Sequence, residues 1–272
     1  MSLYPWDEVD GLRLFTDYLK VLGIAHLDPE KYGEEGLKGK RLGVLNGSSW
    51  IMLWATYFGR KYLPGVHLVN AGTEAMQLNF MEAYQNGKPT PPQSNIDAMA
   101  RYAIDLVELA NVDAVLITCS TMNRSYPFVS KALEPYGVPV MPIDLPMMQK
   151  AVEHGGRVLV VATHGPTVNS TQLLLQETAE KMGKKIEYSG LHIETPWHRL
   201  AEFDIEGHNQ ALAQAVRQKI REEKIDCVVF AQLSMTVFLL SYPDPEKEFG
   251  VPIYTSGKCG FEAMREILLR EK

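Results

Sequence analysis

Two stretches of the chain, VDAVLITCSTMN at residues 112–123 and IDCVVFAQLSMT at residues 225–236, share one plan. Each runs from an aspartate through a short apolar segment to a small polar cluster. A compact apolar run of this length is typical of a buried strand in a parallel sheet. The stretches differ at their polar ends, because Cys119 in the first is matched by Gln232 in the second. We expect both the fold and the chemistry to depend on this pair.

The spacing between the two stretches recurs along the chain. Asp113 and Asp226 are 113 positions apart, as are GVPVMP, which begins at Gly137, and GVPIYT, which begins at Gly250. Upstream, RLGVLNGS at position 41 matches RVLVVATH at position 157, with an offset of 116. Several matches in nearly the same register indicate an internal duplication.

Apolar runs alternate with amphipathic helical stretches. We predict strands at 41–45, 66–70, 113–118, 138–143, 157–162, 226–231 and 251–255, and helices over 95–110 and 208–223. This alternation predicts an α/β fold of two duplicated Rossmann-like lobes, each a parallel sheet flanked by helices. The expected divisions are an N-terminal helical arm over 1–37, a first lobe over 38–153 and a second over 154–272. The C-terminal helix could pack back on the first lobe.

Composition excludes several classes of function. The net charge of −6 and the pI near 5.7 argue against nucleic acid as a partner. No apolar run reaches membrane-spanning length, and the first residues lack the pattern of a secretory signal. The three cysteines are too far apart for a zinc-type pairing, and neither a disulfide framework nor a metal site is indicated. We therefore expect a cytoplasmic protein.

The strand ends indicate where a ligand would bind. In open parallel sheets, ligands bind beyond the carboxyl ends of the strands. Residues 119–123 and 232–236 are therefore expected to face one interlobe cleft, joined there by residues 46–49 and 163–170.

Three segments resemble a known family. DAVLITCSTM resembles the first catalytic motif of the aspartate/glutamate racemase superfamily, in which a strand ends in Cys-Asn-Thr. VVATHGPTVNS, residues 160–170, is similar to the Ala-Thr-x-Gly-Thr-x-x-Ser segment that opens the second lobe, and the two GVP strands are similar to the family's fourth strands. The resemblance covers roughly residues 40–270. It implies two Rossmann-like lobes, no cofactor, a small carboxylic acid substrate in the interlobe cleft and a homodimer.

The resemblance also locates a departure from the family. Racemases of this superfamily use two thiols, one on each face of the substrate carbon, and Cys119 matches the first. The second motif, Gly-Cys-Thr in the family, reads Ala231-Gln232-Leu233 here, and Ser120 replaces the family's Asn. An amide cannot shuttle protons. The first expectation is isomerase- or racemase-type chemistry through Cys119. One thiol alone allows chemistry on one face, and the sequence does not separate this alternative from the first: decarboxylation followed by protonation, or cis-trans isomerisation through addition of the thiol to an activated double bond.

Two other interpretations stay open. Racemase-type isomerisation through Cys119 requires a second acid or base, for which His164 and Cys259 are the candidates. A non-catalytic protein that binds a small acid would keep the polar turns but be indifferent to blocking of the thiol.

The candidate residues follow from these motifs. At a strand-to-helix turn, Cys119 is expected to face a helix N-terminus, which would lower the pKa of its thiol. Cys119 and His164 are the catalytic candidates. The residues predicted to bind substrate, mainly through hydroxyl and amide groups, are Asn46, Ser48, Ser120, Thr121, Arg124, Thr163, Thr167, Ser170 and Gln232.

Overall fold

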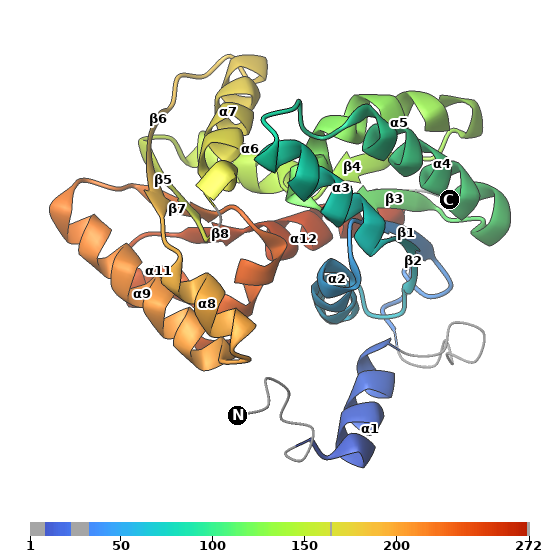
Figure 1. Cartoon of the computed structure of the whole chain (residues 1–272), viewed down its shortest axis with the longest axis horizontal. Coiled ribbons are helices and arrows are strands. Elements are labelled where there is room, and N and C mark those ends of the chain that lie inside the picture. Colours follow the sequence, from blue (N-terminus) through green and yellow to red (C-terminus); the bar gives the residue numbers. More distant parts are fainter. Residues whose placement is uncertain (1–8, 23–32, 164, 271–272) are drawn as a thin grey trace.

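Two four-stranded parallel sheets form the framework of the protein. The computed structural model describes residues 9–22, 33–163 and 165–270. The first sheet has the order β2-β1-β3-β4, from strands β1 (Arg41–Asn46), β2 (His67–Gly72), β3 (Ala114–Ile117) and β4 (Val140–Pro142). The second has the equivalent order β6-β5-β7-β8, from strands β5 (Arg157–Ala162), β6 (Glu187–His192), β7 (Cys227–Phe230) and β8 (Ile253–Thr255). The predicted fold of two duplicated α/β lobes is confirmed (Figure 1).

The helices follow the strands in the same way in both lobes. Helix α1 (Gly11–Leu22) precedes the first sheet. The helices from β1 to β5 are α2 (Ser49–Tyr62), α3 (Glu74–Gln85), α4 (Gln93–Ala110), η2 (Ser120–Ser125), α5 (Tyr126–Leu133), η3 (Glu134–Tyr136) and α6 (Leu145–His154). Those that follow β5 are α7 (Gly165–Lys181), α8 (Thr195–Ala201), α9 (Ile205–Glu222), η4 (Leu233–Val237), α10 (Phe238–Ser241), α11 (Pro245–Phe249) and α12 (Ser256–Arg270).

One strand was not predicted from the sequence. Strand β6 pairs with β5 at the edge of the second sheet, and most of its side chains are at least partly exposed. Its sequence therefore lacks the continuous apolar run that marks a strand covered on both faces. The seven predicted strands are all present.

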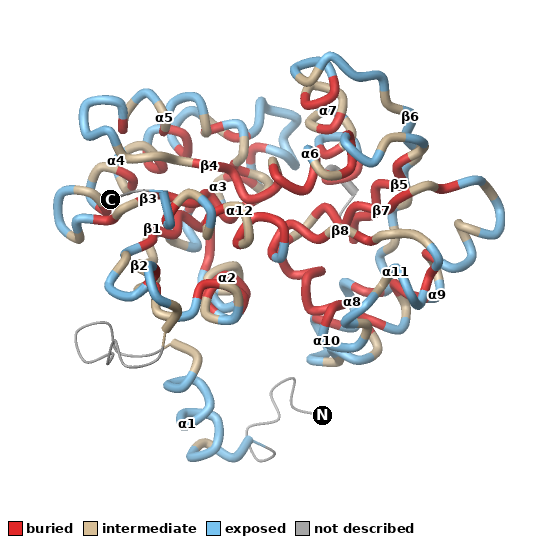
Figure 2. The backbone as a smooth tube through the Cα atoms, turned by 180° about the vertical axis from the view of Figure 1, so that it is seen from behind, coloured by how far each residue is buried: buried red, intermediate tan, exposed pale blue. Residues whose placement is uncertain are grey.

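The last helix of each lobe packs against the sheet of the other lobe. Helix α6 follows β4, yet its Met147 and Met148 lie in a core cluster with side chains of β5 and β7. Helix α12 follows β8, yet its Phe261 and Met264 lie in a core cluster with side chains of β1, β3 and α2. Figure 1 shows α12 between the two sheets, and Figure 2 shows the buried backbone that continues through it from one lobe to the other. The core is therefore shared between the lobes.

The exchanged helices contact each other and approach closely near Gly260. A Cβ atom at this position of α12 would lie 2.8 Å from the carbonyl oxygen of Ile143 and 2.4 Å from its Cγ1 atom. Only glycine leaves room for the segment that enters α6 to pass at this distance. The crossing thus brings the start of α6 beside α12.

The duplicated aspartates of the sequence repeat have a structural role. Asp113 Oδ2 accepts a hydrogen bond from the backbone N–H of Arg41 at 2.7 Å. Asp226 Oδ2 accepts the equivalent bond from the backbone N–H of Arg157, also at 2.7 Å. Each carboxylate therefore satisfies the first donor of its lobe's opening strand, at the end of the sheet opposite to the polar strand ends.

The end of the expected N-terminal arm packs on the rest of the chain. Leu37, assigned by sequence to this arm, is fully buried in the core that α2 and α12 share. Glu34 forms an ion pair with Arg265 of α12. Helix α1 contacts α2 and leaves Leu12 and Phe15 largely exposed. No helix among the described residues is long and apolar enough to cross a membrane.

Replacing Gly260 with alanine is expected to destabilise the whole protein. The added methyl group would press on the Ile143 backbone, which cannot rotate away as a side chain can, at a cost of about 1–3 kcal/mol. The free energy of unfolding, measured by urea titration, checks this. Gly11→Ala is the matched control, because a Cβ atom at that position of α1 would meet nothing within 4 Å. Equal stability of Gly260→Ala and the wild type would contradict so close a crossing of the two helices.

Candidate active site

The polar ends of β3 and β7 open into one cavity of about 310 Å³ between the lobes. The first lobe contributes the start of α2, part of α3 and the turn that follows β3, and the second contributes parts of α7, α8 and η4. The lining residues are Ser48, Trp50, Ile51, Gln77, Met81, Thr118, Cys119, Ser120, Thr121, Thr167, Trp197, Gln232, Leu233 and Ser234. Two positions that the repeat relates, Cys119 and Gln232, thus meet across the same cavity.

Cys119 lies at the end of β3, immediately before η2. Its side chain is 3% exposed, and its Sγ atom is 3.1 Å from the Oγ1 atom of Thr121. Gly47 leaves space for the sulfur, because a Cβ atom there would lie 3.2 Å from Sγ. The thiol therefore has Thr121 as a fixed partner and little free space beside Gly47.

Burial raises the pKa of the Cys119 thiol. Contact with Thr121 and with the backbone of Met122 lowers it in part, and the negative charge of Asp144 raises it further. The sequence-based expectation of a lowered pKa is therefore wrong. The segment after Cys119 is a short 3₁₀-helix, and its effect is smaller than the cost of desolvating a thiolate. The raised pKa favours the protonated form of Cys119.

Gln232, which the sequence repeat matches to Cys119, has a fixed amide orientation. Its Oε1 atom accepts hydrogen bonds from the backbone N–H of Thr163 at 2.7 Å and from the Thr163 hydroxyl at 3.0 Å. A backbone N–H can only donate, so the oxygen must be the end that faces Thr163. The amide NH₂ group is then the end that Gln232 can present to the cavity. The second lobe supplies a hydrogen-bond donor where the first supplies a thiol.

Four further predicted residues line the cavity, and each of them carries a hydroxyl group. Ser48 ends the turn after β1 and caps α2, where its Oγ atom accepts a bond from the backbone N–H of Ile51 at 3.4 Å. Ser120 and Thr121 belong to η2, and Thr167 lies in the first turn of α7. The structure therefore gathers hydroxyls from both lobes around Cys119.

The other predicted binding residues lie near the cavity but do not line it. Asn46 is buried at the end of β1, where its Nδ2 atom is 3.5 Å from Asn70 Oδ1. Thr163 holds the side chain of Gln232, and the Ser170 hydroxyl donates to a backbone carbonyl within α7. His164 lies outside the described residues.

Arg124 makes an ion pair between the lobes. Both carboxylate oxygens of Glu177, on α7, accept hydrogen bonds from its Nη1 atom, at 2.9 and 2.8 Å. The guanidinium group, predicted to bind substrate, is thus engaged by a protein carboxylate and does not line the cavity.

The remaining cysteines are core residues. Cys259, the candidate for a second thiol, packs in the cluster that α6 forms with the second sheet, and burial raises its pKa to about 11. Cys227 lies in β7 in the same cluster. Of the three cysteines, all in the described part of the chain, Cys119 alone lines the cavity.

Sequence reasoning missed the apolar wall of the cavity. Trp50 and Trp197 meet edge to face with ring centroids 5.8 Å apart, and Trp50 packs in the same way on Trp54 at 5.2 Å. Ile51, Met81 and Leu233 extend this wall. No charged side chain is among the described residues that line the cavity. The wall comes from α2, α3 and α8, whose approach depends on tertiary packing, although the position of Trp50 directly after Ser48 and Ser49 is a signal that could have been used.

A buried carboxyl group beside Cys119 was also missed. Asp144, which immediately precedes α6, is 3% exposed, and its Oδ2 atom accepts a hydrogen bond from the Asn123 amide. Burial raises the pKa of this carboxyl group to about 6, although the Ser120, Asn123 and Ser256 side chains lower it in part.

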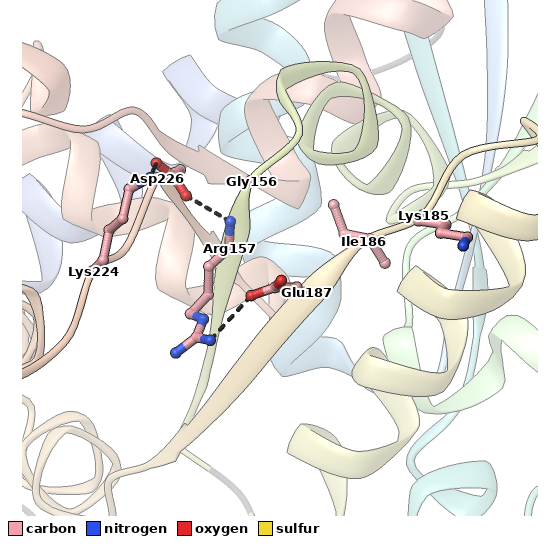
Figure 3. Close-up of a pocket in the computed structure, with 7 residues that line it drawn as sticks. All are labelled: Gly156, Arg157, Lys185, Ile186, Glu187, Lys224 and Asp226. Atoms are coloured by element: carbon pink, nitrogen blue, oxygen red, sulfur yellow. Dashed lines mark hydrogen bonds and ion pairs between the residues drawn. The ribbon is translucent and has the colours of Figure 1, made fainter.

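A second hollow lies at the opposite end of the second sheet. Figure 3 shows its lining: Gly156, Arg157, Lys185, Ile186, Glu187, Lys224 and Asp226. Arg157 is paired with Glu187 at 3.0 Å, and Lys224 with Asp226 at 3.5 Å. No thiol, hydroxyl or imidazole side chain is among these described residues. The charges of this surface are largely paired with one another, so the cavity at Cys119 is the candidate active site.

Comparisons with known proteins bear on the family and the fold of the chain. The family model described as Asp/Glu/Hydantoin racemase matches residues 73–264. An aspartate racemase homologue from Pyrococcus horikoshii OT3 has a similar structure, with a TM-score of 0.63, 14% identity, and coverage of 84% of this chain and 99% of that one. Among proteins with curated functions, none matches the chain significantly.

Two enzymes of known reaction share the fold at lower similarity. For allantoin racemase from Klebsiella pneumoniae, the TM-score is 0.54 at 16% identity, covering 85% of this chain and 88% of that one. For a maleate cis-trans isomerase mutant from Nocardia farcinica, with a covalently bound succinylcysteine intermediate, the TM-score is 0.51 at 16% identity, covering 86% and 99%. At such identities the likeness shows the fold alone.

Proposed function

Because the chain belongs to the Asp/Glu/hydantoin racemase family, we propose that it is an isomerase-type enzyme that acts on a small carboxylic acid through Cys119, without a cofactor. One observation carries this proposal: Cys119 and Gln232, at equivalent strand ends of the two lobes, line the same cavity. Hydroxyl groups from both lobes surround the thiol there. Proton transfer next to a carboxylate requires an acid or base close to the carbon and hydrogen-bond donors that stabilise the developing charge. A thiol beside such donors meets both requirements.

Each group has a distinct part in this chemistry. Cys119, held as a neutral thiol, delivers a proton to the carbon next to the carboxylate. The hydroxyls of Ser48, Thr121 and Thr167 and the amide NH₂ of Gln232 donate hydrogen bonds to the carboxylate and to the negative charge that develops on it. These donors are already in place, so little reorganisation is needed as the charge forms.

The reaction is confined to one face of the substrate. Racemisation requires an acid and a base on opposite faces, and Gln232 can serve as neither. Isomerisation with one thiol proceeds instead by addition: sulfur bonds to one carbon of an activated double bond and the proton to the other. Rotation about the resulting single bond and elimination then restore the thiol and give the other geometric isomer. The succinylcysteine of the maleate isomerase mutant is a precedent for the adduct.

Decarboxylation is the second candidate, favoured by the protonation state of Cys119. Loss of CO₂ from an acid with two carboxyl groups on one carbon leaves an enediolate that needs a proton. The raised pKa of the Cys119 thiol keeps that proton on the sulfur until the enediolate has formed. The thiolate is then reprotonated from solvent.

The cavity wall indicates the class of acid. Trp50, Trp197 and Leu233 provide a flat apolar surface, and the described lining residues include no cation. A carboxylate remote from the reacting carbon would be desolvated there without a partner, which is costly. We therefore propose an acid whose charge lies next to the reacting carbon and whose remaining part is apolar.

Turnover should depend on Cys119 and on this distribution of charge. In proton NMR with aryl- and alkyl-substituted malonates, cis-unsaturated acids, amino acids and longer dicarboxylic acids, we expect the wild type to convert an acid with an apolar substituent. Cys119→Ser should lose about 10³-fold or more in kcat, because a serine hydroxyl is a far weaker acid and nucleophile. Binding of the acids without conversion, unchanged in Cys119→Ser, would instead indicate a non-catalytic binding protein.

Gln232→Glu should distinguish the two roles of Gln232: its bonds to Thr163, which hold the side chain in place, and the hydrogen bond that its NH₂ group donates to the substrate. A carboxylate can still accept both bonds from Thr163, but it presents an acceptor to the cavity in place of the NH₂ donor. We expect kcat/KM for the reacting acid to fall about 10²–10³-fold. Gln218→Glu, on the exposed face of α9, adds the same charge outside the cavity and should leave kcat/KM unchanged. Full activity of Gln232→Glu would show that the amide donates nothing to the substrate.

A further inference from the structure

A cluster of buried polar atoms lies behind the Cys119 turn. Within the described part of the chain, Ser120 Oγ, Asn123 Oδ1, Asp144 Oδ1 and Ser256 Oγ are buried without a hydrogen-bond partner of normal geometry. Buried polar groups are almost always paired, so four in one place are unusual. The bond from the Asn123 amide to Asp144 Oδ2 holds part of the cluster together. One oxygen of the Asp144 carboxyl group and three polar atoms around it therefore lack a hydrogen-bond partner of normal geometry.

The exchanged helices create this arrangement. Asp144 immediately precedes α6, and Ser256 is the first residue of α12. The close approach of Gly260 to Ile143 brings the two helix starts together. Ser120 and Asn123 belong to η2, the turn that carries Cys119. Asp144 therefore joins the reactive turn of the first lobe to a helix that follows the last strand of the second.

We propose that Asp144 is the positioning residue of this site: its carboxyl group braces the turn that carries Cys119, and its negative charge controls how readily Cys119 releases its proton. The effect of Asp144 on turnover rests on the proposed function, whereas its effect on the Cys119 thiol does not. Asp144 does not line the cavity, so we infer that it acts through Cys119.

The electrostatic part of the role has a definite sign. The side chains that face Asp144, namely Ser120, Asn123 and Ser256, are neutral. The charged residue of η2, Arg124, is paired with Glu177 of α7. The negative charge of Asp144 raises the pKa of the Cys119 thiol, although by less than burial does. Above pH 7 the carboxyl group is ionised, because its pKa is about 6. Its charge then opposes formation of the thiolate and keeps the proton on sulfur.

The pH dependence of Cys119 alkylation tests this proposal directly. The rate of modification by iodoacetamide, followed by mass spectrometry of the peptide that contains Cys119, reports the thiolate fraction between pH 6 and 11 on the order of minutes to hours. Asp144→Asn removes the charge and keeps the shape. We expect its profile to move to lower pH by about half a unit or more relative to the wild type. Asp144→Glu, which keeps the charge, should restore a profile close to that of the wild type.

Asp113→Asn is the matched control. Asp113 is also a carboxylate that accepts a backbone N–H bond in the first lobe, but it lies at the far end of β3. Its substitution should leave the profile in place. Asp144→Ser, smaller and also neutral, carries the same expectation as Asp144→Asn if that variant does not fold by circular dichroism. A profile of the folded neutral variant that superimposes on that of the wild type would overturn the proposal, as would an equal shift in Asp113→Asn.

The test is independent of the reaction. Alkylation is measured without a substrate, so a shifted profile supports the role of Asp144 even if no acid in the panel is converted. Conversion of an acid by the wild type, together with an unshifted profile in Asp144→Asn, would keep the proposed function and remove Asp144 from it.

Discussion

The crossing of α6 and α12 is the constraint on which the rest of the structure depends. Each helix leaves its own lobe and completes the core of the other, so neither sheet is covered without its partner. The crossing needs the bare backbone of Gly260 against Ile143. It also sets the two strand-end turns, with Cys119 and Gln232, at a fixed separation across one cavity. A cleft between independently moving lobes could not hold two groups in register in this way.

By the resemblance, Cys119 stands where the family has its first thiol, whereas Gln232 carries an amide where the family has its second. A buried thiol is costly to ionise, and the nearby carboxylate of Asp144 adds to that cost. In a racemase with two thiols, such a group would be half of an acid–base pair. In this chain the other half is an amide whose oxygen is committed to Thr163 and whose NH₂ group is a fixed donor. The pair is therefore suited to holding negative charge and protonating it from one side. The Trp50–Trp197 wall favours an acid with an apolar remainder over one with a second, distant charge.

Local patterns predicted most of the fold but only part of the site. The apolar runs at β1, β3, β5 and β7 are buried on both faces and could be read directly, whereas β6, an exposed edge strand, could not. Cys119 and Gln232 were found because the repeat places them at strand ends. Trp197 and Asp144 were not, since their places beside the cavity and beside the Cys119 turn depend on tertiary packing. The expected lowering of the Cys119 pKa was wrong for the same reason. Burial depends on the packed structure, and it raises the pKa by more than the local turn lowers it.

The configuration of the carbon that gains a proton tests the central claim most directly. Wild-type protein would convert a reacting prochiral acid in D₂O, and the new C–D bond would be assigned by chiral-phase separation and deuterium NMR. With Cys119 as the acid among the described residues that line the cavity and Gln232 as its neutral counterpart, deuterium should be found in one configuration only. Equal amounts of both configurations, formed in a Cys119-dependent reaction, would mean that a second acid acts from the opposite face and would contradict one-faced chemistry at this site.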